Sequence, residues 1–133
     1  MRISRRLLAA SLIAVILAAC SDALSPSPQL LDGTWRQEGE VPGSSNVWTL
    51  TVSEAGITGT GTWSGEACCG GTLAITGHVQ GDSIYLAVKT TGSPFISPDS
   101  SVAIVAVLRS STEMAAFPRA TPGSGEFRMR KSP

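Results

Sequence analysis

The chain has 133 residues, which is enough for one domain and leaves no room for a second of ordinary size. Ten Lys and Arg residues balance ten Asp and Glu residues, so the formal net charge is zero. Without a basic excess the chain lacks the electrostatic footprint of a nucleic-acid-binding protein, which excludes that class.

The first residues differ in composition from the rest of the chain. A short basic segment with three arginines, residues 2–6, precedes an apolar run, residues 7–19, that only Ser11 interrupts. Thirteen residues of helix span about 20 Å, which is shorter than the roughly 30 Å hydrocarbon core of a bilayer. We therefore expect a helical signal peptide over residues 1–19 rather than a permanent transmembrane helix.

The apolar run ends in Leu17-Ala18-Ala19-Cys20, which resembles the lipobox of bacterial lipoproteins. The resemblance implies cleavage before Cys20 and acylation of its thiol, for example with palmitate, so that this residue anchors the protein to a membrane. An ordinary secretory signal followed by a coincidental cysteine is the alternative. Ser21 stands where lipoproteins retained in the inner membrane carry an aspartate. The resemblance thus favours the cell envelope, at the outer membrane facing the periplasm.

Loss of the leader would leave seven basic residues against ten acidic ones. Such a mildly acidic domain offers no basic patch for anionic lipid, so attachment depends on the acyl chains. Residues 21–30 contain two prolines and three serines, which resist helix formation and packing. We expect residues 20–30 to be an acylated cysteine and a flexible tether, and residues 31–133 to form one domain.

From residue 31 onward, apolar and polar residues alternate and Gly, Thr and Ser interrupt the alternation, a pattern typical of strands and tight turns. An antiparallel meander of eight strands leaves no open edge if it closes into an up-and-down barrel. We predict this all-β barrel, with a two-sheet β-sandwich as the alternative. The expected strands cover 33–39, 46–53, 57–65, 71–79, 83–90, 101–109, 112–118 and 125–131.

The second hairpin is the best defined. Gly56 suits the positive φ that closes a tight turn after residues 54 and 55. If Val52 pairs with Ile57, then Leu50 lies opposite Gly59 and Trp48 opposite Gly61. Large side chains would then cover the glycines across the strand pair and hold the register. Further along, residues 102–108 are apolar throughout, which predicts a strand covered on both faces or a contact surface.

Gly33-Thr34-Trp35, together with the hairpin from Trp48 to Trp63, resembles the opening of calycin-type barrels, the lipocalin-like and avidin-like proteins. The resemblance covers roughly residues 31–90 and implies that Trp35 plugs the closed barrel end, with Arg128 or Arg130 packed over it. A simple core role for Trp35 is the alternative. Biotin binding does not carry over, because Gly61 and Trp63 stand where the avidin-like tyrosine and serine are expected.

Cys68 and Cys69 are adjacent, and in an oxidising compartment they would close a strained vicinal disulfide that stiffens a turn. Two idle thiols, or a redox or metal-sensing role, are the alternatives. A zinc site that also uses His78 is rejected, because six residues of strand place that side chain about 20 Å from the cysteines. No metal is therefore expected.

No catalytic residue or cofactor site is predicted. His78 is the single histidine and its parity points it outward, so no nucleophile has a base beside it. Glu38 and Glu40 fall in a loop, where a solvated edge is the simpler interpretation. We expect a protein that is not an enzyme.

Two functions remain. The first is a structural or interaction module of the envelope that docks a protein partner through the loop carrying Phe95 and Ile96 or through residues 102–108. The alternative is a lipocalin-like barrel that binds a small hydrophobic ligand or lipid in a cavity behind Trp48, Trp63 and Phe127. Gly59, Gly61 and Gly77 would make room in it. An interior void of about 300 Å³ or more would favour ligand binding, whereas the short chain favours the filled barrel.

Overall fold

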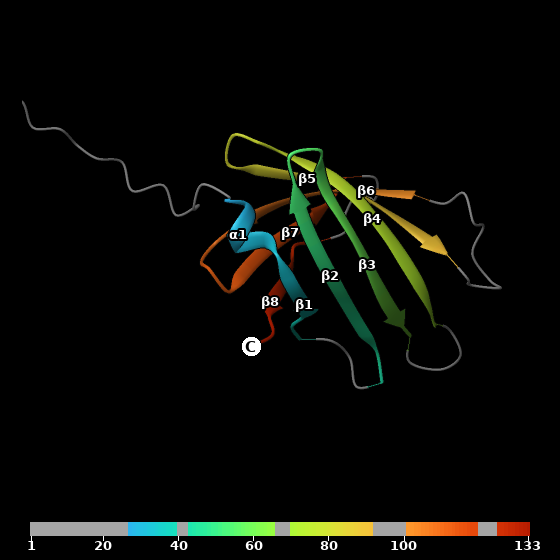
Figure 1. The fold of residues 1–133 in the computed structure, drawn as a ribbon. Coiled ribbons are helices and arrows are strands. Elements are labelled where there is room, and N and C mark those ends of the chain that lie inside the picture. The colour runs from blue at the N-terminus through green and yellow to red at the C-terminus, as the bar shows by residue number, and fades with distance from the viewer. Residues whose placement is uncertain (1–26, 40–42, 66–69, 92–100, 120–124) are drawn as a thin grey trace, which may run out of the picture.

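The computed structural model describes residues 27–39, 43–65, 70–91, 101–119 and 125–133. Its eight strands form one closed barrel in which each strand pairs antiparallel with its sequence neighbours (Figure 1). The strands are β1 (Gly33–Gln37), β2 (Ser45–Ser53), β3 (Gly56–Ser64), β4 (Gly70–Gln80), β5 (Ser83–Thr91), β6 (Ser101–Leu108), β7 (Glu113–Pro118) and β8 (Phe127–Lys131).

The last strand closes the barrel by pairing with the first. Trp35 of β1 lies opposite Lys131 of β8, and Gln37 lies opposite Met129. This pairing removes both sheet edges, so the predicted up-and-down barrel is confirmed and the two-sheet sandwich is excluded. The predicted signal peptide, residues 1–19, and Cys20 lie outside the described residues.

The predicted register of the β2–β3 hairpin is confirmed. Val52 pairs with Ile57, Leu50 with Gly59 and Trp48 with Gly61. The turn between the strands closes at Gly56, whose φ of 125° is accessible to glycine at little cost.

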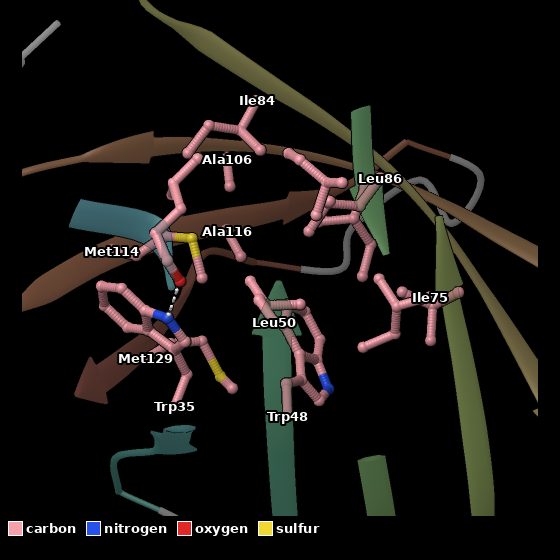
Figure 2. Packing of buried hydrophobic residues seen from close by; sticks show 14 of the residues in the cluster. Trp35, Trp48, Leu50, Ile75, Ile84, Leu86, Ala106, Met114, Ala116 and Met129 are labelled. Carbon is pink, nitrogen blue, oxygen red and sulfur yellow. Dashed lines mark hydrogen bonds between the residues drawn. The ribbon is translucent and has the colours of Figure 1, made fainter. Parts of the chain in front are cut away.

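The core of the barrel is formed by inward-facing side chains, one at every second residue of a strand. Strand β2 shows this period, since Trp48 and Leu50 are buried while Thr49, between them, and Thr51, after them, are exposed. All eight strands contribute residues to this buried cluster, and Figure 2 shows Ile75, Ile84 and Met114 among them. No charged or polar residue of the described part is buried.

One end of the barrel is closed by a single helical turn, α1 (Pro28–Leu31) (Figure 1). Leu31 is fully buried, and its carbonyl accepts a hydrogen bond of 2.9 Å from the indole Nε1 of Trp35, the dashed line in Figure 2. Lys131 Nζ donates to the Leu30 carbonyl at 3.0 Å. The prediction of a flexible tether over residues 20–30 is therefore wrong from Pro28 onward, where the chain is helical. The reason is that Leu30 and Leu31 pack against the core.

The cation beside Trp35 is not the arginine that the resemblance implies. Lys131 Nζ lies 5.6 Å from the Trp35 ring centroid. Lys131 shares the inward parity of Phe127 and Met129, whereas Arg128 and Arg130 are exposed on the outer surface. The prediction of Arg128 or Arg130 over Trp35 is therefore wrong, while the burial of Trp35 at the closed end is confirmed.

Strand β6 is covered on one face only. Ile104, Ala106 and Leu108 are buried in the core, while Val102 is 41% exposed on the same side, at the start of the strand. Val105 and Val107 on the outer face are half-buried. The sequence predicted that residues 102–108 form either a strand covered on both faces or a contact surface. The first of these predictions is wrong for the described residues.

The described residues hold a complete folding unit. Each of the eight strands has two hydrogen-bonded neighbours, and the buried cluster extends from Leu31 to Met129. A polypeptide of residues 27–133 therefore carries the whole barrel with its closing turn.

Candidate functional site: a cup at the open end of the barrel

The end of the barrel opposite α1 is hollow. A cavity of about 490 Å³ that opens to solvent lies where β1, β3 and β5 end and where β2, β4, β6 and β8 begin. We call this cavity the cup. Its apolar lining consists of Trp48, Trp63, Leu73, Val88, Val102, Ile104 and Phe127, and its polar lining of Gln37, Ser44, Ser45, Asn46, Ser64 and Thr90, with Gly39 at the mouth.

The two kinds of lining occupy different sides of the cup. Five of the six polar residues come from β1, β2 and β3 or the positions next to them, which are consecutive strands of the barrel. The aliphatic residues come from β4, β5 and β6. Trp48 and Phe127 pack edge to face, with ring centroids 5.9 Å apart and planes at 88°. The cup therefore offers a largely apolar wall with one neutral, hydrogen-bonding side.

Hydrogen bonds order the polar side. The indole Nε1 of Trp48 donates to Asn46 Oδ1 at 2.8 Å, and Asn46 Nδ2 donates to Gln37 Oε1 at 3.1 Å. The hydroxyls of Ser45 and Ser64 lie 3.0 Å apart across the β2–β3 pair. Two carboxamides are thus held in fixed positions at the wall of the cup.

One polar atom near the cup lacks a partner. The indole Nε1 of Trp63 is buried, and it donates to no acceptor among the described residues. Leaving a buried donor unsatisfied costs about 1–3 kcal/mol. Such an atom in a binding protein is typical of a place where a ligand or water completes the hydrogen bonding.

None of the described residues that line the cup carries a charged side chain. A second hollow adjoins it through Gln37, Gly39 and Phe127 and adds Glu38, Glu126 and Arg128. The hydrogen bond from Arg130 holds the pKa of Glu38 below its ordinary value, and the charge of Arg130 adds to the effect. Arg130 also reaches Glu113 at 3.5 Å, so this cation of β8 pairs with β7 and with the residue that follows β1 on the outer surface.

The structure brings together three of the four aromatic residues that the sequence assigned to a core or ligand cavity. Trp48, Trp63 and Phe127 line the cup, whereas Trp35 belongs to the core at the closed end. Sequence reasoning missed Gln37 and Asn46. Asn46 lies two residues before Trp48 and therefore shares its inward parity, which is the signal that could have found it.

The prediction that Gly59, Gly61 and Gly77 leave room for a ligand is wrong. A Cβ at Gly61 would lie 2.5 Å from the Val47 carbonyl oxygen and 3.1 Å from the Trp48 ring. Neighbouring backbone and the covering side chains already occupy the space, and none of the three glycines lines the cup. The hollow arises instead from the ends of the strands, above the last filled layer of the core.

The remaining candidates lie elsewhere. His78 is exposed on the outer surface, as predicted, and its ring stacks on Tyr85 with centroids 5.2 Å apart. No three His, Cys, Asp or Glu side chains within the described ranges are grouped so that they could hold a metal ion. Cys68, Cys69, Glu40, Phe95 and Ile96 lie outside the described residues.

No protein-family model, curated protein or solved structure matches the chain. Among the residues that the structure describes, no helix combines the length and apolar character needed to cross a bilayer.

Proposed function

We propose that this chain is a lipid-anchored protein of the cell envelope that binds a small apolar ligand in the cup of a calycin-type barrel, without catalysis. The observation that carries the proposal is the volume and lining of the cup. About 490 Å³ falls within the range of roughly 300–1,000 Å³ in which small-molecule sites occur. This volume supports ligand binding over the filled, structural barrel that the short chain had favoured.

The arrangement of the two ends supports the same function. At the closed end, α1, Trp35 and Leu31 fill the interior and hydrogen-bond to each other. At the open end, apolar surface of Val102 remains exposed. Burial of this apolar surface by a ligand would provide binding energy of about 25 cal/mol per Å².

A neutral fluorescent dye, N-phenyl-1-naphthylamine, tests the proposal directly. Its fluorescence rises in apolar surroundings, so we expect a saturable increase on titration into the polypeptide 27–133. Val102→Trp, at the mouth of the cup, fills space that the dye needs and should weaken binding at least tenfold. Val79→Trp is the matched control, because Val79 is similarly exposed at 38% but does not line the cup. No saturable binding, or equal binding by both variants, would contradict the proposal.

The anchor is a separate part of the proposal and depends on the motif Leu17-Ala18-Ala19-Cys20. In a bacterial host fed an alkyne analogue of palmitate, the full chain should be labelled and should fractionate with the outer membrane. Cys20→Ala should abolish labelling. Labelling of both chains would refute acylation at this cysteine while leaving ligand binding intact.

A further inference from the structure

The hydrogen bonds on the polar side of the cup have a fixed direction. An indole N–H can only donate, so the Asn46 atom that Trp48 contacts at 2.8 Å must be the carboxamide oxygen. The other Asn46 atom is then the NH₂ group, and the Gln37 atom 3.1 Å from it must in turn be an oxygen. The chain of hydrogen bonds from Trp48 through Asn46 to Gln37 therefore ends with the NH₂ group of Gln37, which supplies donors at the mouth of the cup. Chains of hydrogen bonds of this kind polarise one another and strengthen the terminal donors.

The charge around the cup favours a neutral ligand. The lining, as far as the structure describes it, contains no cation that could pair with a carboxylate. The adjoining hollow contributes Glu38 and Glu126 against Arg128. An anion entering the cup would lose hydration without gaining a cationic partner, and burying an unpaired charge is costly.

We infer that the ligand is an uncharged molecule whose apolar body lies against the aromatic and aliphatic wall and whose hydrogen-bond acceptor, such as the carbonyl of an acyl ester, accepts from Gln37. This inference rests on the proposed function, and it specifies the chemical class that the cup takes. Trp63 also lines the cup, and its indole N–H is a buried donor that lacks an acceptor among the described residues.

Displacement of bound N-phenyl-1-naphthylamine tests the inference with three probes that share an eight-carbon chain: methyl octanoate, octanoate and octane. Methyl octanoate carries the acceptor without charge, octanoate adds the charge, and octane has neither. At neutral pH we expect methyl octanoate to bind at least about tenfold more tightly than octanoate. Equal or tighter binding of octanoate would overturn the inference.

Gln37→Glu removes the NH₂ donor, keeps an acceptor for Asn46 and adds a negative charge, so its effect on the donor is measured as the ratio of methyl octanoate to octane, which has no acceptor. We expect it to weaken methyl octanoate about fivefold, which is the effect of one lost neutral hydrogen bond, and to leave octane unchanged. Gln80→Glu is the matched control, since the exposed Gln80 lies at the β4–β5 turn and does not line the cup.

The outcomes separate the inference from the proposed function. An unchanged ratio of methyl octanoate to octane in Gln37→Glu, with the dye still bound, would overturn the inference and leave ligand binding standing. Absence of dye binding in the unaltered polypeptide would overturn the proposed function and the inference together.

Discussion

Two tryptophans of the barrel differ in the hydrogen bonding of their indole N–H, and this difference predicts unequal losses of stability when each is replaced by phenylalanine. Trp35 Nε1 donates to the Leu31 carbonyl at 2.9 Å in the closed end. Trp35→Phe keeps most of the buried ring but leaves that carbonyl without its donor, which costs about 1–3 kcal/mol. The smaller ring also leaves a void and a weaker contact with Lys131. We expect Trp35→Phe to destabilise the fold by about 2–3 kcal/mol.

Trp63→Phe removes an N–H that is buried and has no acceptor among the described residues. The relief of this unsatisfied donor offsets the lost ring contacts, so we expect a change within about 0.5 kcal/mol of zero, or a stabilisation. Urea unfolding of the polypeptide 27–133, followed by far-ultraviolet circular dichroism, gives both free energies of unfolding. Equal losses in the two variants, or a larger loss in Trp63→Phe, would refute the assignment of one satisfied and one unsatisfied indole.

Three further substitutions test the fold. Gly61→Ala should lower the free energy of unfolding in urea by about 1–3 kcal/mol, because its Cβ would meet a backbone oxygen. Gly125→Ala is the control, since a Cβ there has no atom within 4 Å, and it should change stability by less than about 0.5 kcal/mol. Similar effects of the two substitutions would contradict the close approach of the strands at Gly61. Glu38 has a lowered folded-state pKa, so its ionisation stabilises the fold at higher pH, and this contribution is lost as pH falls from about 5 to about 3. The urea midpoint of Glu38→Gln should therefore fall less over that interval than the wild-type midpoint. If the two midpoints fall equally with pH, the pair of Glu38 and Arg130 contributes nothing to stability. Lys131→Met should speed amide hydrogen exchange in α1 by about tenfold, since it removes the hydrogen bond to that turn; unchanged exchange would assign the lysine no role there.

The sequence predicts the barrel and one hairpin in detail because both follow from the two-residue period of side chains along a strand. Val52 and Ile57 flank a turn whose glycine takes positive φ, and this fixes the pairing of every residue toward Trp48 and Gly61. The same period places Asn46 and Lys131 inside, although both are polar, and the interpretation of Arg128 and Arg130 failed because it ignored that parity.

The hollow of the cup could not be predicted in the same way. Alternation along a strand shows whether a side chain points into the barrel or outward, but it does not show how far along the barrel axis the side chain lies. That position decides whether an inward residue contacts residues from the opposite side of the barrel. Trp48 and Trp63 face the same interior, yet only Trp48 is fully buried while Trp63 remains half-exposed near the mouth. The closing turn Pro28–Leu31 was missed because prolines and serines before it resemble a tether, whereas burial of Leu31 decides its conformation.

The three tryptophans give the most direct test of ligand binding in the cup, because each indole N–H has its own nuclear magnetic resonance signal. On titration of the polypeptide 27–133 with methyl octanoate, the signals of Trp48 and Trp63, which line the cup, should shift and saturate together. The signal of Trp35, hydrogen-bonded in the closed end, should stay in place. A saturable shift confined to Trp35, or no shift of any indole signal, would contradict a binding site in the cup.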